Sequence, residues 1–216
     1  VTSPAGSVIA GKNRLMIWDA VSTQDKNQTP TQCLYNPTSI TIACAIHKDV
    51  KVWDALTGEL VSHFQNIMPS DITCLSLDFR ERKFIASDQA GNVAAFNYLN
   101  GSKMKDNSSA NHQSEIASMV YGTHDKVVLT AGWDKTIRVY DETQPTSVEG
   151  LRRVIGAHTQ DISALALSHD LSLIASGGED GFIRFWDFQF LSLEGETYTG
   201  KGTIAVAFFD PYPIMA

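Results

Sequence analysis

The segment from Gly6 to Asn13 comes nearest to an enzymatic motif. It differs at one residue from the P-loop pattern, a glycine-rich loop that cradles a nucleotide phosphate, because Asn13 stands where a Ser or Thr would hold Mg²⁺. The residues Val8-Ile9-Ala10 form an apolar run typical of a strand, and no helical pattern follows Lys12. Since the motif works only between a strand and a helix, we interpret this segment as a strand and a turn.

The histidines suggest a second possible chemistry, metal binding or nucleophilic catalysis: His47, His63, His112, His124, His158 and His169. None has the HExxH spacing of a zinc enzyme. His124-Asp125 and His169-Asp170 fall in equivalent turns of a repeat, which favours a role in the turn. Ser168, His169 and Asp170 are neighbours in one turn, whereas the members of a catalytic triad come from separate parts of a fold. We therefore predict no catalytic residue, no metal ligand and no cofactor.

The three cysteines, Cys33, Cys44 and Cys74, are odd in number and form no CxxC pair. We expect neither a disulfide framework nor a zinc site, and hence a reducing compartment such as the cytoplasm. The longest strictly apolar run, Ile204 to Phe209, is far shorter than the roughly 20 residues that cross a bilayer. The sequence therefore predicts no membrane partner.

The elements that position these residues follow an internal repeat. Five segments end alike, in apolar residues followed by Asp or Asn: Met16–Asp19, Lys51–Asp54, Ala94–Asn97, Arg138–Asp141 and Arg184–Asp187. Their last residues are 35, 43, 44 and 46 residues apart. The last two units align without a gap, from His112 to Asp141 and from His158 to Asp187. A regular period of this size indicates a repeat architecture.

Each unit contains short apolar runs separated by turn residues. Examples are the runs Ile162–Leu167 and Phe182–Trp186, with the turn residues Gly177–Gly181 between them. A further run follows the closing Asp, as in Leu60–Phe64. These patterns predict strands, so that each unit is a four-stranded antiparallel meander and the fold is all-β.

The repeated residues resemble the WD-repeat signature. The resemblance rests on Gly156-Ala157-His158, the turn residue Asp180 and the closing Trp186-Asp187, and it extends over essentially the whole chain. It implies a β-propeller with one four-stranded blade per repeat. It also implies a buried hydrogen-bond network of His, Ser or Thr, Asp and Trp in a blade. The matching residues are His158, Ser176, Asp180 and Trp186 in the last full unit and His112, Thr130, Asp134 and Tyr140 in the unit before.

Two other units depart from this pattern. The third unit ends in Phe96-Asn97 and has Ala90 where the turn Asp would lie, and the second unit has His47-Lys48-Asp49 there. We expect apolar packing to hold those blades more than a polar network.

The period divides the chain into a single propeller segment of about five blades. We expect a partial blade at 1–30, blades at 31–70, 71–110, 111–157 and 158–201, and the start of the next blade at 202–216. Because a closed ring protects edge strands, the remainder of a larger ring is expected outside this sequence.

Within the family, the middle of the chain is similar to WD-repeat proteins of cilia and flagella. The similarity lies in Asp71–Asp78, Phe96–Gly101 and Leu129–Asp134. It implies a place in the axoneme or another cytoskeletal assembly.

Trp133 is the strongest candidate for binding a partner. It lies in the tight turn beside Asp134, where the next unit has Glu179, and a Trp on a rigid turn is a typical interface anchor. The alternative is that Trp133 covers its own blade. Glu179, the counterpart of Trp133, is a further candidate. By the family's geometry the residues that follow each His share this face, and they complete the candidate set: Gln113, Ser114, Glu115, Thr159, Gln160 and Asp161.

The chain has 216 residues, with Asp+Glu 24 against Lys+Arg 17 and a net charge of −7. This charge disfavours a nucleic-acid partner. The sequence predicts a non-catalytic scaffold that binds other proteins of a larger assembly and no small-molecule substrate. One alternative is a substrate-recognition or regulatory subunit of a soluble complex such as a ubiquitin ligase. Another is a propeller enzyme with a site in the central channel, which the mainly apolar runs Ile72–Leu77 and Ile162–Leu167 disfavour.

Overall fold

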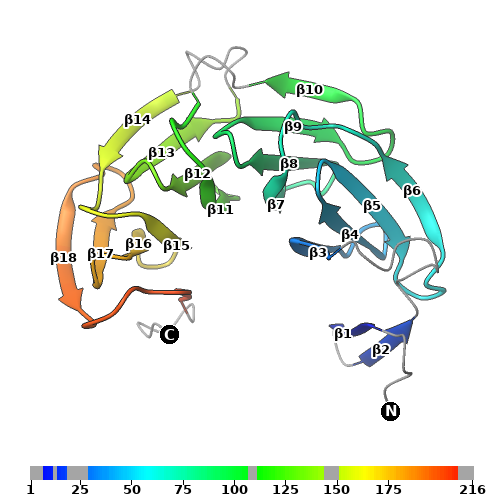
Figure 1. The fold of residues 1–216 in the computed structure, drawn as a ribbon, viewed down its shortest axis with the longest axis horizontal. Coiled ribbons are helices and arrows are strands. Elements are labelled where there is room, and N and C mark those ends of the chain that lie inside the picture. The colour runs from blue at the N-terminus through cyan, green and yellow to red at the C-terminus, as the bar shows by residue number, and fades with distance from the viewer. Residues whose placement is uncertain (1–6, 12–13, 19–28, 107–110, 144–150, 209–216) are drawn as a thin grey trace.

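The computed structural model describes residues 7–11, 14–18, 29–106, 111–143 and 151–208. In these residues all regular secondary structure is β-strand, and none of them is helical. Figure 1 shows the strands gathered into sheets that follow one another along an open arc. The fold is all-β, as the repeat predicts.

Four sheets have four strands each, and consecutive strands pair antiparallel in every one. Blade 1 contains β3 (Gln32–Asn36), β4 (Thr41–Ile46), β5 (Asp49–Asp54) and β6 (Leu60–Phe64). Blade 2 contains β7 (Ile72–Leu77), β8 (Lys83–Asp88), β9 (Val93–Asn97) and β10 (Lys103–Asp106). Blade 3 contains β11 (Ile116–Gly122), β12 (Val127–Gly132), β13 (Thr136–Asp141) and β14 (Leu151–Gly156). Blade 4 contains β15 (Ile162–Ser168), β16 (Leu173–Gly178), β17 (Phe182–Asp187) and β18 (Leu193–Tyr198).

The strands of a blade differ in burial according to their place in the arc. Every residue of β4 and of β12 is buried. This explains why their sequences are continuous apolar runs rather than alternating ones. By contrast β18 is exposed at all but one residue and lies at the outer edge (Figure 1).

The core lies between adjacent blades. Between blades 1 and 2 the rings of Phe64 and Phe84 stack with centroids 6.0 Å apart, and within blade 2 Phe84 also stacks on Phe96 with centroids 5.3 Å apart. Between blades 3 and 4 Ile137 and Trp186 belong to one buried cluster. The first strands also contact directly, β3 with β7, β7 with β11 and β11 with β15, and they line the inside of the arc (Figure 1). This packing fixes each blade against the next.

The segment that resembles a P-loop includes the first strand of a hairpin. β1 (Ser7–Gly11) pairs antiparallel with β2 (Arg14–Trp18) in a two-stranded sheet. The strand β1 is in keeping with our interpretation of the apolar run. Gly6, Lys12 and Asn13 lie outside the described residues.

The segment expected to start the next blade is not a strand in its described part. Residues 202–207 form no strand, and Phe208 makes a single bridge. The Thr203 N–H donates to the Gly178 carbonyl (3.3 Å), and the Ser163 hydroxyl donates to the Thr203 carbonyl, so this segment lies against blade 4. The blade boundaries and the larger ring remain predictions.

Cys33 and Cys44 form a disulfide, which corrects the expectation that no cysteines pair. The register of β3 and β4 places the two residues opposite each other, with Cα atoms 4.1 Å apart. The sequence contains a signal for this pair that the prediction missed. Asn36 and Thr41 pair at the base of the turn, and each cysteine lies three residues beyond one of them, so that the two cysteines stand opposite each other. Cys74 is a free, buried thiol, and burial raises its pKa. The cysteines therefore no longer support the expectation of a reducing compartment.

Candidate protein-binding face

The network residues of the last full repeat come together inside blade 4. The Trp186 indole N–H donates to Ser176 Oγ (2.9 Å), and Ser176 Oγ lies 2.8 Å from His158 Nε2. On the other side of the imidazole, His158 Nδ1 lies 2.9 Å from Asp180 Oδ1. These side chains form one continuous chain of hydrogen bonds from the indole to the carboxylate.

The direction of these bonds follows from the chemistry of the groups. Because the Asp180 carboxylate only accepts, His158 Nδ1 carries the proton and Nε2 accepts from the Ser176 hydroxyl. This requires a neutral imidazole, and burial lowers the pKa of His158 although the hydrogen bond with Asp180 acts in the opposite sense. Burial by itself would raise the pKa of Asp180, but hydrogen bonds from Arg184 and His158 hold it well below its usual value.

Blade 3 has the same network with two different side chains. His112 Nδ1 lies 2.9 Å from Asp134 Oδ1, and His112 Nε2 lies 2.7 Å from Thr130 Oγ1. Tyr140 stands in place of the Trp, is completely buried, and has its pKa raised to about 12 by that burial. The predicted His, the Ser or Thr and the Asp are thus joined by hydrogen bonds in both blades.

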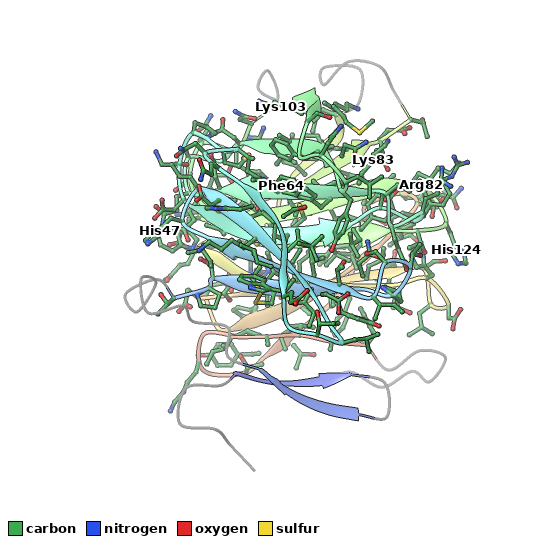
Figure 2. All side chains as sticks on the ribbon, turned by 90° about the vertical axis from the view of Figure 1, so that its right-hand side faces the viewer. His47, Phe64, Arg82, Lys83, Lys103 and His124 are labelled. Carbon is green, nitrogen blue, oxygen red and sulfur yellow. A yellow bond between two sulfur atoms is a disulfide. The ribbon has the colours of Figure 1, made fainter. Side chains whose placement is uncertain are left out.

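The networks also hold loop residues on one side of the sheets. The second carboxylate oxygen of each Asp accepts from a backbone N–H, from Gln113 to Asp134 (3.1 Å) and from Thr159 to Asp180 (3.1 Å). We use the name face A for the surface formed by these segments before each first strand and by the turns between each second and third strand. Figure 2 shows one such turn residue, His47, at the left.

In blade 2 the backbone N–H groups of the turn between the second and third strands donate to an Asp that the sequence analysis missed. Met68 is buried where the His would lie, but Asp88, two residues before Ala90, is also completely buried. Asp88 Oδ1 accepts from the N–H groups of Ala90 (3.0 Å) and Asn92 (2.8 Å), and the Asn92 side-chain amide donates to both carboxylate oxygens. The expectation of mainly apolar packing is therefore incomplete, because a carboxylate still caps this turn.

Trp133 lies on face A with 46% of its surface exposed. Its backbone N–H donates to the Glu115 carbonyl (2.9 Å), and the counterpart Glu179 N–H donates to the Asp161 carbonyl (2.8 Å). The turn is thus tied to the segment before the first strand in both blades. The backbone of Trp133 is fixed while its indole faces solvent.

A hollow of about 370 Å³ lies beside Trp133. Segments of blades 1 to 3 line it: Thr29, Thr31, His47, Asp71, Ile72, Thr73, Gln89, Glu115, Ala117 and Trp133. Of the predicted binding residues, the structure brings Trp133 and Glu115 together here. Sequence analysis missed Asp71 and His47, although Asp71 shares with Glu115 and Asp161 the repeat position directly before a first strand.

The rim of this hollow is acidic. Asp71 and Glu115 line it, and burial raises the pKa of the Glu115 carboxyl. The His47 Nδ1 lies 3.1 Å from Asp71 Oδ2 at an exposed site. The other predicted binding residues lie on face A but do not line the hollow: Gln113, Ser114, Thr159, Gln160, Asp161 and Glu179.

His124 and His169 lie outside the two networks. The rings of His124 and His169 stack with centroids 4.6 Å apart between equivalent turns of blades 3 and 4. Ser168 Oγ accepts from the Leu171 N–H (3.1 Å) in the same turn. Across the described ranges, no group of three or more His, Cys, Asp or Glu side chains is placed to hold a metal ion. No helix there is long and apolar enough to cross a membrane.

Comparison with known proteins agrees with the repeat. Residues 107–141 and 150–187 match the family model described as WD domain, G-beta repeat. The chain is 24% identical over 123 residues to Cilia- and flagella-associated protein 337 B of Tetrahymena thermophila, which covers 53% of this chain and 10% of that protein. It is 24% identical over 200 residues to Autophagy-related protein 16 of Arabidopsis thaliana, covering 88% of this chain and 38% of that protein. It is 40% identical over 63 residues to Small ribosomal subunit protein RACK1 of Neurospora crassa, covering 29% of this chain and 19% of that protein.

Residues 107–141 and 150–187 therefore carry WD repeats, and the four-stranded antiparallel sheets are of the kind that forms propeller blades. WD-repeat proteins are in general scaffolds for protein interactions. The chain spans at most 38% of the length of the three relatives named above.

Proposed function

We propose that this chain is a non-catalytic platform on which another protein docks through face A around Trp133. The observation that carries the proposal is the half-exposed indole of Trp133 beside an acidic hollow. Its backbone is held by the hydrogen bond to the Glu115 carbonyl. A partner that binds a preformed surface of this kind loses little free energy to ordering on the platform's side.

The proposal includes the chemistry of the docking segment. Asp71 and Glu115 at the hollow favour a partner segment with Lys or Arg side chains. The exposed indole favours an apolar or cationic group packed against its ring. The partner we propose is a protein, and no nucleic acid, membrane or small-molecule substrate takes part.

We further propose that the assembly is cytoskeletal, in the cytoplasm or the ciliary axoneme. The support is the similarity of the middle of the chain to ciliary WD-repeat proteins and the match to Cilia- and flagella-associated protein 337 B. Crosslinking mass spectrometry on the native assembly tests this. Crosslinks from Lys48 or Lys135, which flank the hollow on face A, to axonemal or other cytoskeletal proteins would support it.

The variant Trp133→Ala in the full-length protein tests the docking site. We expect the affinity for the crosslinked partner to fall by about 30-fold or more, with lower recovery in a pull-down, since an interface Trp commonly contributes about 2 kcal/mol or more. The thermal unfolding midpoint should stay unchanged, because the indole is half exposed. Phe190→Ala, an aromatic residue with 66% exposure outside face A, is the matched control. If Trp133→Ala lowers the midpoint and leaves recovery intact, Trp133 covers its own blade and the proposal is wrong.

A further inference from the structure

A second hollow lies on the other side of the sheets, between blades 2 and 3. Its volume is about 410 Å³, within the usual range of ligand sites. The turn that joins β7 to β8 contributes Phe79, Arg80 and Arg82, and the turn that joins β11 to β12 contributes Lys126. We use the name face B for this side. Figure 2 shows Arg82 and His124 on it, opposite His47 of face A.

The charged groups of this hollow are predominantly cationic. Four cations line it, Arg80, Arg82, Lys83 and Lys126, against the two carboxylates of Asp78 and Glu142. This local excess of positive charge stands out in a chain whose net charge is −7.

Both carboxylates are already engaged. Asp78 is buried, and its Oδ1 accepts from the backbone N–H groups of Arg82 and Lys83, both at 2.8 Å. Glu142 Oε1 pairs with Lys83 Nζ at 2.8 Å, and the Tyr121 hydroxyl donates to its other oxygen.

Arg80, Arg82 and Lys126 remain as candidates for binding a ligand. Within the described part of the chain, Arg80, Arg82 and Lys126 make no ion pair. Because unpaired cations of adjacent turns converge on one hollow, they favour an anion there.

An aromatic ring organises two of these cations. Phe79 is 39% exposed, and its ring centroid lies 5.0 Å from the Arg80 guanidinium carbon and 4.8 Å from Lys126 Nζ. Such cation–π contacts orient the charged groups. Met104, which is 52% exposed, adds a second apolar surface to the hollow.

The backbone beneath the cations is fixed. The Tyr98 N–H donates to the Arg82 carbonyl (2.9 Å), and the Glu142 N–H donates to the Lys126 carbonyl (3.0 Å). Each turn is thus bonded to a later segment of its own blade. A ligand that binds here therefore meets cations on preformed turns.

We propose that this hollow binds an acidic segment of a partner protein through an oxyanion group. The anionic side chain lies between Arg80, Arg82 and Lys126, and an apolar neighbour packs on Phe79 and Met104. The guanidinium groups suit either a carboxylate or a phosphate, because their planar donors bind two oxygens at once. A phosphorylated residue and a run of Asp or Glu share this chemistry, and the test separates them.

The test measures peptide binding to the purified full-length protein by fluorescence polarisation. Three labelled peptides have the same sequence, with a central Leu, and differ only at the residue after that Leu, which is phosphoserine, Glu or Gln. We expect the two anionic peptides to bind and the Gln peptide to bind at least about tenfold more weakly. Added salt should weaken the anionic peptides, since the contacts are partly exposed.

Charge variants locate the site. The double substitution Arg80→Gln with Arg82→Gln should weaken the anionic peptides about tenfold or more. Lys135→Gln with Lys201→Gln removes the same charge from exposed residues outside the hollow and should leave binding unchanged. Phe79→Ser should also weaken binding, and equal thermal midpoints show that each variant is folded.

Some results identify the anionic group of the partner, and others would overturn the proposal. Tighter binding of the phosphoserine peptide assigns a phosphorylated partner, and equal binding of the two anionic peptides assigns an Asp- or Glu-rich one. Equal binding of the Gln peptide, unchanged binding to the Arg80 and Arg82 variant, or tighter binding of a single-stranded oligonucleotide overturns the proposal. Trp133→Ala should not affect binding of these peptides. A negative result for the hollow on face B is therefore distinguishable from a negative result for the docking site on face A.

Discussion

At the residue scale, the carboxylate of Asp180 joins the interior of blade 4 to face A. Besides His158 it bonds the Thr159 N–H (3.1 Å), the Phe182 N–H (3.2 Å) and the Arg184 guanidinium (2.9 Å). Arg184 also donates to the Ala157 carbonyl and to Glu196, so removal of the carboxylate costs most at the buried His158 N–H, which loses its acceptor in a nearly inaccessible place. The same carboxylate thus stabilises the blade and fixes an exposed loop.

We predict that Asp180→Ala lowers the free energy of unfolding by about 1–3 kcal/mol, because a buried donor without an acceptor carries that penalty. Urea denaturation measures the change. The exposed turn residue Asp170 is the control, and Asp170→Ala should change stability by less than about 0.5 kcal/mol. Equal effects of the two substitutions would argue that the network contributes nothing.

The same network predicts how stability depends on pH. The pKa of His158 is lowered from 6.5 in the folded chain, mainly by burial, so the unfolded chain takes up its proton first as the pH falls below that value. Stability should therefore decrease below about pH 6.5. The pKa values of Asp134 and Asp180 are lowered from 3.8, so both carboxylates stabilise the fold above that pH and lose this contribution below it.

Urea midpoints measured from about pH 7.5 to pH 3 should thus fall in two stages. His158→Gln should remove the first stage and keep the second, because Gln does not titrate. A midpoint that stays constant between about pH 7 and pH 5 in the unsubstituted protein would contradict the assignment of a neutral, buried imidazole.

At the element scale, the turns between second and third strands are capped in different ways. Blades 3 and 4 use Asp134 and Asp180, whereas blade 2 uses Asp88. Blade 1 has a tighter turn at His47-Lys48, where His47 adopts a positive φ of 51°. The repeat therefore preserves the strands more closely than the residues that cap them.

We predict that Asp88→Ala destabilises blade 2 by about 2–3 kcal/mol, because Asp88 is a charged acceptor for several donors. Hydrogen-exchange mass spectrometry should show faster exchange in β8 and β9. Asp125→Ala, in an exposed turn of blade 3, should leave exchange in blade 2 unchanged. Unchanged protection of β8 and β9 in Asp88→Ala would show that apolar packing alone holds this blade.

At the scale of the whole molecule, the two faces of the arc differ in charge. Face A has an acidic hollow with Asp71 and Glu115, and face B has a cationic hollow with Arg80 and Arg82. The net charge of −7 is a sum over the whole chain and does not indicate that the two hollows differ in charge. A platform with opposite charges on opposite sides can hold a basic segment of one partner and an acidic segment of another.

Contacts between blades also belong to this scale. Lys83 of blade 2 pairs with Glu142 of blade 3, and the rings of His124 and His169 stack between blades 3 and 4. These residues are 59 and 45 positions apart along the chain. The repeat period places His124 and His169 in equivalent turns, but no period of the sequence indicates that Lys83 and Glu142 meet.

The sequence by itself determined the strands and the meander, and its resemblance to WD repeats pointed to the network residues of blades 3 and 4. These depend on side-chain alternation, turn residues and offsets inside one repeat, all of which are local. His158, Ser176 and Asp180 fall within 23 residues of one another, so all three lie in a single repeat and can be found by aligning it with the next one.

The tertiary structure alone decided which residues of different strands and blades stand opposite each other. Strand register pairs Cys33 with Cys44 and shifts the cap of blade 2 to Asp88. Packing of one blade on the next creates both hollows and brings Asp71 to Trp133 and Lys126 to Phe79. The physical reason is that hydrogen bonding within a repeat is set by short segments of chain, whereas contact between repeats depends on how whole sheets stack and twist.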